Sequence, residues 1–329
     1  MTYSGELSGN APRKVSVVVP TCNRAHLLRG ALASIRALEG PDLVFEILVA
    51  DNGEPHESSV IAEEFGAIYV RVAAKGAAAA RTEALSRATG EFIAFLDDDD
   101  EWLPSNVRAQ LAMLDENPEL DGVIAQVITT DPTLQKHGEP WPAQHPGTGD
   151  QLVRAMLSGF FPQIGSVVVR KRVRDLIGFF DESLIGGQDL DWQLRIARRH
   201  TLGHVRTPVV LFRGREPGTY ESLQLRRVGF DRLIFLRHAL AEWRIWKTPM
   251  AFLSAYTGML SYFYWYFIYV AGEAAARGER GRALRAVGST FCVFPFRACY
   301  HLLTRAGLRR SLLVGLFGAP RAMAARQSS

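Results

Sequence analysis

Four consecutive aspartates, residues 97–100, directly follow an apolar run at residues 91–96. A buried strand that ends in four like charges calls for a cation at that end, because close carboxylates repel one another and raise each other's pKa values. Hard divalent cations such as Mg²⁺ take oxygen ligands, and a metal beside phosphates commonly neutralises a nucleoside diphosphate. The alternative is a solvated acidic turn before a helix, whose first turn Pro104 would suit. The position directly after a strand favours the metal and phosphate interpretation.

The first hundred residues alternate between short apolar runs and segments with helical periodicity. Strands are predicted at residues 15–19, 45–50, 67–72 and 91–96. Helices are predicted between them, at residues 23–38, 58–65 and 76–88, with Asn23 as the cap of the first. This alternation predicts an α/β fold with a mostly parallel sheet, flanked by helices on both faces and joined by right-handed connections.

Polar residues follow the carboxyl ends of three predicted strands. Pro20 and Thr21 follow the first, Asp51 follows the second, and the four aspartates follow the fourth. Ligands of such sheets bind at this edge, so the three segments are predicted to converge on one crevice. Asp51 alone would be interpreted as a turn residue. Beside the other two segments it is predicted to contact the base or ribose of a nucleotide.

The second half of the chain is less regular. Strands are predicted at residues 121–130, 166–170 and 205–212, and a helix at residues 188–200. Residues 131–150 are rich in Pro, Gly and His and are expected to form a long loop, which either gates an acceptor site or is a mobile surface loop. From about residue 219 the chain is predicted to be helical to its end.

Charge separates the chain into an acidic front and a basic tail. From residue 223 onwards sixteen Arg and Lys accompany four Asp and Glu, which gives a net charge of +12. The net charge of +4 for the whole chain leaves −8 for the residues before it.

Three cysteines in 329 residues argue against a disulfide framework and favour a reducing compartment. No apolar signal core occurs near the start, so residues 1–13 are expected to be a disordered N-terminus rather than a secretory signal.

An uncharged stretch rich in Tyr, Phe and Trp occupies residues 249–272, and arginines follow it. Three interpretations are open. Interfacial helices lying on an anionic leaflet suit the aromatic and basic residues best. A transmembrane helix suits the length, and a buried core or dimer helix is the purely structural interpretation. Nucleic acid is not an expected partner, because bulky apolar residues are interleaved with the basic ones.

Five ordered motifs between about residues 14 and 215 resemble those of the family 2 glycosyltransferases, which have the GT-A fold, a Rossmann-like α/β sheet. The motifs are VVVPTCNR at residues 17–24, ADNG at 50–53, KGAAAAR at 75–81, GEFIAFLDDDDEW at 90–102, and GFFDE at 178–182 with GQDLDWQLR at 187–195. The resemblance implies a nucleotide-diphosphate sugar donor, most often a UDP-sugar, together with Mg²⁺ or Mn²⁺. It also implies inverting transfer by a single displacement.

The same resemblance implies roles for individual residues. Asp189 would be the general base, and Asp97 and Asp99 would ligate the metal. The nucleotide pocket would contain Pro20, Thr21, Arg24, Asp51, Arg81 and Asp98, with Asp51 on the base and Asp98 facing the ribose or the metal. Asp191 and Trp192 would position the acceptor, although Trp192 could instead pack in the core.

Two positions depart from the family pattern. Gln188 precedes Asp189 where the family has Glu-Asp, which leaves Asp189 as the base. The segment Thr82-Glu83-Ala84 replaces Asn-x-Gly, so one contact of the family is missing. Without the upstream motifs, Asp189 would be interpreted as an acid in the first turn of a helix, where it favours the helix dipole.

These observations predict a GT-A domain over residues 14–218 and a helical, membrane-associating region over residues 219–329. The expected activity is transfer of a sugar to a lipid-linked or growing cell-surface glycan, by an enzyme that is peripheral or monotopic at the cytoplasmic face of the membrane. A polyprenyl-phosphate glycosyltransferase is one alternative. A catalytically silent membrane protein that binds nucleotide sugars is another, suggested by Gln188.

Overall fold

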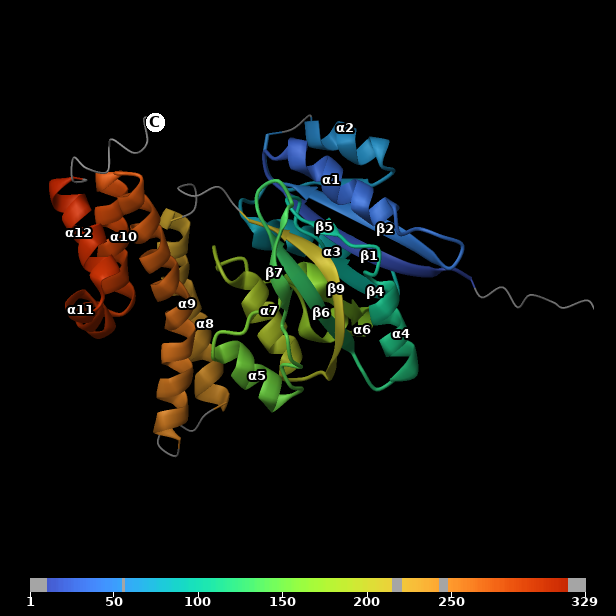
Figure 1. Cartoon of the computed structure of the whole chain (residues 1–329). Helices are drawn as coiled ribbons and strands as arrows, with labels where there is room; N and C mark the ends of the chain where they lie inside the picture. Colours follow the sequence, from blue (N-terminus) through green and yellow to red (C-terminus); the bar gives the residue numbers. More distant parts are fainter. Residues whose placement is uncertain (1–10, 55–56, 215–220, 243–247, 319–329) are drawn as a thin grey trace, which may run out of the picture. The chain divides into compact units, whose positions relative to one another are not determined.

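The computed structural model describes residues 11–54, 57–214, 221–242 and 248–318, and they fall into two compact units (Figure 1). The first, here called the sheet unit, comprises Met1–Val153 and Phe161–Gly214. The second, here called the helical unit, comprises Arg154–Phe160 and Arg215–Ser329. The predicted domain boundary at residues 218 and 219 lies outside the described residues, as do residues 1–10 of the predicted disordered N-terminus.

The strands all belong to the sheet unit. They are β1 (Arg13–Thr21), β2 (Leu43–Asp51), β3 (Ile68–Arg71), β4 (Phe92–Phe95), β5 (Glu101–Trp102), β6 (Gly122–Thr130), β7 (Lys136–Trp141), β8 (Val167–Arg170) and β9 (Leu202–Arg213). The helices of this unit are α1 (Ala25–Arg36), α2 (Glu57–Glu64), α3 (Ala77–Arg87), α4 (Arg108–Glu116), α6 (Lys171–Ile177), α7 (Gln188–Ala197) and the short 3₁₀ helix η1 (Ile164–Ser166). Helix α5 (Asp150–Leu157) contains residues of both units.

A single sheet contains these strands in the order β3-β2-β1-β4-β8-β6-β9-β5, with β7 paired to β6. The first four run parallel, as predicted, and β9 runs parallel to β6. However, β8 is antiparallel to both β4 and β6, and β5 and β7 are antiparallel to their neighbours. The sheet is therefore mixed, and the prediction of a mostly parallel sheet is wrong. Apolar periodicity identifies a buried strand but does not report its direction.

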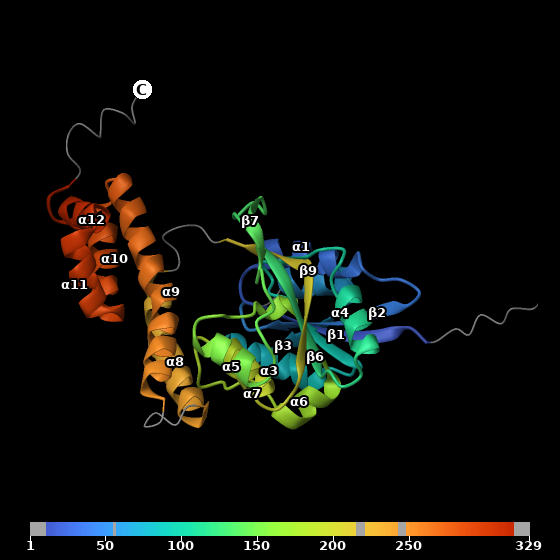
Figure 2. The same cartoon turned by 60° about the horizontal axis from the view of Figure 1, so that its bottom comes forward.

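Helices cover both faces of the sheet. On one face, Val17 of β1 and Leu32 and Ile35 of α1 belong to a core cluster that also includes α2 and α4. On the other face, Phe95 of β4 packs against Trp192 of α7, with ring centroids 5.2 Å apart. Figure 1 shows α1 and α2 next to each other, and Figure 2 shows α3, α6 and α7 grouped together. The carboxyl ends of the strands therefore lie at the edge of the sheet, between the two helical layers.

Asn23 is not the predicted cap of the first helix. Its φ is 55°, and its side-chain oxygen Oδ1 accepts a hydrogen bond from the backbone N–H of Glu54 at 2.6 Å. Helix α1 begins at Ala25 without a side-chain cap. A short polar side chain tolerates the left-handed conformation, so here it connects two loops at the carboxyl edge rather than capping a helix.

Two further local predictions are wrong. Strand β7 lies within the predicted loop at residues 131–150, where it pairs with β6. Pro104 does not start a helix, because a turn separates it from α4, which begins at Arg108. Both errors concern segments without a clear apolar period, where pairing with a neighbouring strand or a local turn decides the conformation.

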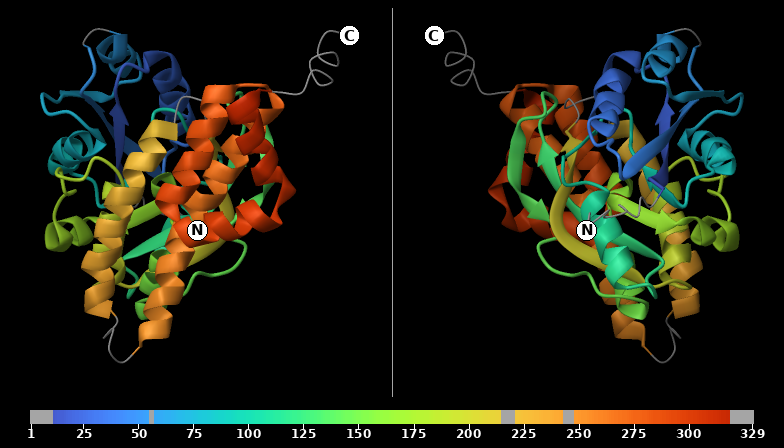
Figure 3. Two further views of the ribbon diagram at one scale, coloured as in Figure 1. Left: turned by 90° about the vertical axis from the view of Figure 1, so that its left-hand side faces the viewer. Right: turned by 90° about the vertical axis from the view of Figure 1, so that its right-hand side faces the viewer.

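The helical unit contains α8 (Glu221–Glu242), α9 (Pro249–Ala276), α10 (Arg280–Val293), α11 (Pro295–Thr304) and α12 (Ala306–Phe317). One side of α9 is buried within the unit, at Phe263, Tyr264 and Phe267. Its Val270 and Ala271 pack with residues of α10 and α12 in a small core. Figure 3 shows the ribbons of these three helices side by side. None of the helices in the described part of the chain is both long enough and apolar enough to cross a bilayer.

Candidate active site

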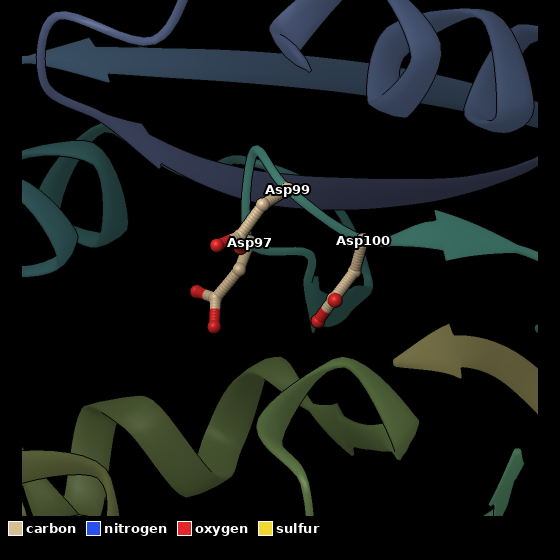
Figure 4. Close-up of side chains that lie close together, drawn as sticks. All are labelled: Asp97, Asp99 and Asp100. Carbon is tan, nitrogen blue, oxygen red and sulfur yellow. The ribbon is translucent and has the colours of Figure 1, made fainter. Parts of the chain in front are cut away.

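The aspartate tract forms a tight loop between β4 and β5. Asp97, Asp99 and Asp100 each place a carboxylate oxygen within 4.8 Å of the others (Figure 4). Asp99 and Asp100 are buried and Asp97 is half-buried. Three converging carboxylate oxygens form a hard donor set that fits Mg²⁺ or Mn²⁺. The predicted ligands Asp97 and Asp99 are therefore adjacent, and Asp100 adds a third carboxylate that sequence reasoning did not assign.

Asp98 points away from this cluster towards the first strand. Its side chain is fully buried, and its Oδ2 accepts a hydrogen bond from the hydroxyl of Thr21 at 2.7 Å. The Arg24 guanidinium contacts both Asp98, with Nη2 and Oδ1 2.5 Å apart, and Asp99, with Nη1 and Oδ2 2.6 Å apart. Burial raises the pKa of Asp98 to about 7, although the charge of Arg24 acts in the opposite direction. Arg24 thus pairs with two of the four aspartates of the tract, although its single charge can offset only one of them.

Asp100 is fixed from the second half of the chain. Its Oδ2 accepts a hydrogen bond from Nε2 of Gln163 at 2.7 Å, and its Oδ1 accepts one from the backbone N–H of Arg213 at 2.8 Å. The Arg213 side chain in turn donates to the carbonyl oxygen of Asp99 at 2.6 Å and to that of Pro132 at 2.8 Å. Arg213 therefore holds the backbone of the aspartate loop in place.

Sequence reasoning missed Gln163 and Arg213. Arg213 is the last residue of β9, so the rule that placed Asp51 at a strand's carboxyl end could have found it. Gln163 lies in an irregular segment before η1, where no pattern marks it.

Arg81 is buried within α3 and pairs with Asp97, with Nη2 and Oδ1 2.5 Å apart. Its Nε and Nη1 are buried without a hydrogen-bond partner. Burial alone would lower the pKa of Arg81, but the carboxylates of Asp97 and Asp189 raise it overall. The side chain therefore lies near both the aspartate tract and Asp189 of α7, with two buried N–H groups that lack a partner.

Asp51 is fully buried at the end of β2, directly opposite Thr21 of β1. Its Oδ1 accepts from the backbone N–H of Gly53 at 2.8 Å, and its Oδ2 accepts from the hydroxyl of Tyr69 at 3.0 Å. Burial, and then the charge and hydrogen bond of Asp51, raise the pKa of Tyr69. Pro20 is buried beside Thr21, opposite Ala50. The predicted nucleotide residues of β1 and β2 therefore occupy neighbouring positions at one edge.

Helix α7 carries the predicted base. Gly187 precedes the helix with a φ of 71°, a conformation that favours glycine. Asp189 follows in the first turn, half-buried, and its Oδ1 accepts from the backbone N–H of Leu190 at 3.0 Å. Its charge acts on Arg81, so it lies on the side of α7 that faces the aspartate tract.

The two predicted acceptor residues on α7 point elsewhere. Trp192 has no exposed surface, stacks on Phe180 with ring centroids 5.0 Å apart, and donates from Nε1 to the carbonyl oxygen of Gly178. A ring without exposed surface cannot serve as a platform for a sugar, so the core-packing alternative describes Trp192. The carboxylate of Asp191 is also buried, and its Oδ2 accepts from Nε of Arg195 at 2.9 Å.

A comparison with protein-family profiles finds a match over the segment that contains the aspartate tract. Residues 16–175 match the profile described as "Glycosyl transferase family 2". This segment includes β1 from Ser16 onwards, all of β2 and β4, and the whole aspartate tract. This segment of the chain belongs to glycosyltransferase family 2. The profile match ends before α7, so it does not include Asp189.

Curated glycosyltransferases match the chain over part of their length. The UDP-Glc:alpha-D-GlcNAc-diphosphoundecaprenol beta-1,3-glucosyltransferase of Escherichia coli is 34% identical over 31% of this chain and 42% of its own length. The GalNAc(5)-diNAcBac-PP-undecaprenol beta-1,3-glucosyltransferase of Campylobacter jejuni is 35% identical over 27% of this chain and 31% of its own. The glycosyltransferase AglE of Haloferax volcanii is 26% identical over 55% and 60%. The chain thus spans between about a third and three fifths of these relatives.

Solved structures with the same fold extend the likeness to nearly the whole chain. Residues 1–349 of S. aureus TarS in complex with UDP-GlcNAc match with a TM-score of 0.56 and 17% identity, over 96% of this chain and 92% of that one. The complex of the same protein with UDP matches with a TM-score of 0.54 and 16% identity over the same shares. At this identity the likeness concerns the fold, which is the α/β fold with a mixed sheet described above.

Proposed function

We propose that this family 2 chain is a metal-dependent, inverting glycosyltransferase. It would move a sugar from a nucleoside diphosphate to a lipid-linked or growing cell-surface glycan. The observation that carries the proposal is the cluster of Asp97, Asp99 and Asp100 beside two arginines, the buried Arg81 and the half-buried Arg24. A divalent cation held by carboxylates binds phosphate oxygens, and so do guanidinium N–H groups. A site that combines the two therefore suits a diphosphate.

The donor is proposed to be a UDP-sugar, since the structural neighbour has been solved with UDP and with UDP-GlcNAc. Thr21 and Asp51, on neighbouring strands, would contact the uridine, together with Pro20. Asp98 and Arg24 would line the ribose and phosphate side of the pocket. Arg81 would donate from Nε and Nη1 to the diphosphate, which supplies the partners that these buried atoms lack.

Asp97 and Asp99, with Asp100, would hold the cation. A bound Mg²⁺ or Mn²⁺ would stabilise the negative charge that develops on the leaving diphosphate. Asp189 would accept the proton of the acceptor hydroxyl as its oxygen attacks the anomeric carbon from the face opposite the diphosphate. The bond between the anomeric carbon and the diphosphate oxygen breaks as the new glycosidic bond forms, which inverts the configuration. Gln188 cannot take that proton, because an amide has no basic site at neutral pH.

The acceptor is proposed to be lipid-linked, because two relatives are named for undecaprenol-linked acceptors. The basic charge of residues 223–329 and the aromatic α9 support attachment of the C-terminal region to an anionic membrane at its cytoplasmic face.

Turnover of UDP-sugars with and without Mn²⁺ tests the site. Asp99→Asn is expected to lower metal-dependent transfer or donor hydrolysis by about a hundredfold or more, because it removes a ligand of the cation. Asp175→Asn is the matched control, since that carboxylate is exposed on α6 and pairs with its neighbour Arg174. Turnover that needs no metal and is unaffected by Asp99→Asn would reject the proposal.

A further inference from the structure

Helix α11 exposes a continuous apolar stripe. Phe296, Tyr300 and Leu303 recur at helical spacing and are 85%, 63% and 79% exposed. The opposite side of the same helix, at Ala298 and His301, is buried in the helical unit. Bulky apolar side chains exposed in register on one face of a helix mark a surface that another phase or molecule covers. Helix α12, which follows directly, also exposes Leu313, Leu316 and Phe317.

This part of the chain has an unbalanced charge. Between residues 280 and 317 the sequence contains seven arginines and neither Asp nor Glu. These residues form α10, α11 and α12, which pack on one another and on α9 (Figures 1 and 3). An apolar stripe within an acid-free, arginine-rich set of helices fits a partner that is both apolar and anionic.

Two of these arginines gather at one tryptophan. The guanidinium carbons of Arg297 and Arg305 lie 5.4 Å and 4.9 Å from the ring centroid of Trp265, which is 37% exposed. Arg297 also donates from Nη1 to the hydroxyl of Ser261 at 2.8 Å. Among the residues that the structure describes, no carboxylate pairs with either guanidinium. Two like charges held on one ring without a counter-ion leave N–H donors for a phosphate.

We propose that α11 and α12 dock on an anionic lipid leaflet. Phe296, Tyr300 and Leu303 would insert among the acyl chains, and Arg297 and Arg305 would bind lipid phosphates beside Trp265. Trp at the level of the headgroups and arginines around it are the arrangement expected of an interfacial helix. This inference rests on the proposed function, whose lipid-linked acceptor lies in a membrane, and it names the surface through which the enzyme reaches it.

Two other occupants of this surface fit less well. A second copy docked face to face would place the arginines of one α11 and α12 pair against the same arginines of the other, and like charges oppose that contact. Nucleic acid would satisfy the arginines, but it offers nothing to three bulky apolar side chains in a row. Both are outcomes that the following experiment can detect.

Sedimentation of the full chain with vesicles tests the proposal. The chain is expected to bind vesicles of phosphatidylcholine with phosphatidylglycerol, and to bind those of phosphatidylcholine alone much less. Phe296→Ser with Leu303→Ser is expected to lower the partition coefficient about tenfold or more, because two apolar side chains that would insert into the acyl region are lost. Arg305→Gln is expected to lower it by about fivefold, the effect of one basic residue near an anionic surface.

Controls with matched exposure come from the sheet unit. Leu176→Ser and Arg199→Gln remove an exposed apolar and an exposed basic side chain, and they are expected to leave vesicle binding unchanged. Equal binding by the parent and the α11 variants would overturn the proposal, and so would absence of binding to anionic vesicles. A change of oligomeric state in the α11 variants, measured by light scattering, would instead identify a contact between copies. Loss of RNA binding without loss of vesicle binding would identify a nucleic acid surface.

The outcome of this experiment does not depend on whether the proposed function is correct. Metal-dependent hydrolysis of a UDP-sugar in solution is measured on the same variants and needs no vesicles. Hydrolysis without vesicle binding would overturn the membrane surface alone. Vesicle binding without hydrolysis would overturn the catalytic proposal alone.

Discussion

One cluster of charge in each unit is built in a different way. In the sheet unit, the aspartate tract is paired with arginines, and in each pair one partner is buried, as Arg81 is with Asp97 and Asp98 is with Arg24. In the helical unit, Arg297 and Arg305 have no carboxylate partner within the part of the chain that the structure describes, and they lie next to exposed apolar side chains. Buried pairs are costly unless their geometry is kept, so they define a site for a particular ligand. Exposed arginines without partners define a surface for a diffuse anionic partner. Variants that separate turnover from vesicle binding test whether this contrast is real.

The largest expected effect is at the proposed base. Asp189→Asn should lower kcat for transfer to an alcohol acceptor by about a hundredfold to ten-thousandfold, because the acceptor hydroxyl then lacks a positioned base. Donor affinity and vesicle binding should stay at the level of the parent chain. Initial rates and calorimetry with a UDP-sugar measure both quantities. Full activity on a polyprenyl phosphate, which is already ionised, would favour that acceptor class instead.

Trp192→Ala tests whether Trp192 acts in core packing or in acceptor binding. The variant should lose about 3–5 kcal/mol of unfolding free energy, because it removes a fully buried ring that packs on Phe95 and Phe180. Trp192→Phe, which keeps most of the packing, should lose less. Denaturant unfolding measures the difference. Unchanged stability with a raised KM for the acceptor would mean that the ring contacts a sugar after all.

A smaller effect is expected for a buried carboxylate far from the aspartate tract. Hydrogen bonds from Lys14, Ser16 and Thr89 outweigh the effect of burial and lower the pKa of Glu46 from its usual 4.5 to about 2. A depressed pKa of an acid stabilises the fold above the unfolded-state pKa, and this contribution is lost as the pH falls towards 2. Glu46→Gln should therefore cost about 1–2 kcal/mol at pH 7 and little near pH 2.

Urea unfolding at several pH values measures that gap between Glu46→Gln and the parent chain. Turnover at pH 7 should be unaffected, since Glu46 pairs with residues at the opposite ends of β1 and α3 from the site. A gap that does not change with pH would mean that the charge of Glu46 contributes nothing to stability.

The parallel half of the sheet was predictable from the sequence for a physical reason. Short apolar runs alternating with helical periods lead to β1, β2, β3 and β4, and the carboxyl-end rule then brings Thr21, Asp51 and the aspartates together. Local patterns are enough here because β1, β2 and β3 are each followed by a helix of their own. The resemblance of the five motifs to family 2 added the roles of Arg24, Arg81 and Asp189.

In the other half, the strands at residues 121–130, 166–170 and 205–212 were predicted, but their pairing was not predictable because it is not local. Strand β8 inserts between β4 and β6 with reversed direction, and no nearby pattern specifies that position or direction. Gln163 and Arg213 reach Asp100 from residues 63 and 113 positions away in the sequence. The cap predicted at Asn23 was wrong for the same reason. Its side chain accepts a hydrogen bond from the backbone N–H of Glu54, in another loop, instead of capping α1. Burial of Trp192 likewise depends on Phe95 and Phe180, which come from separate segments.

Calorimetric titration of UDP, with Mn²⁺ and then with a chelator, tests most directly whether the aspartate tract joins the nucleotide through a divalent cation. The account predicts at least about tenfold tighter UDP binding with Mn²⁺ in the parent chain, because the metal contributes ligands to the diphosphate. It also predicts that Asp99→Asn abolishes this gain and that Asp175→Asn keeps it. Equal affinity with and without the metal in the parent chain would contradict the account.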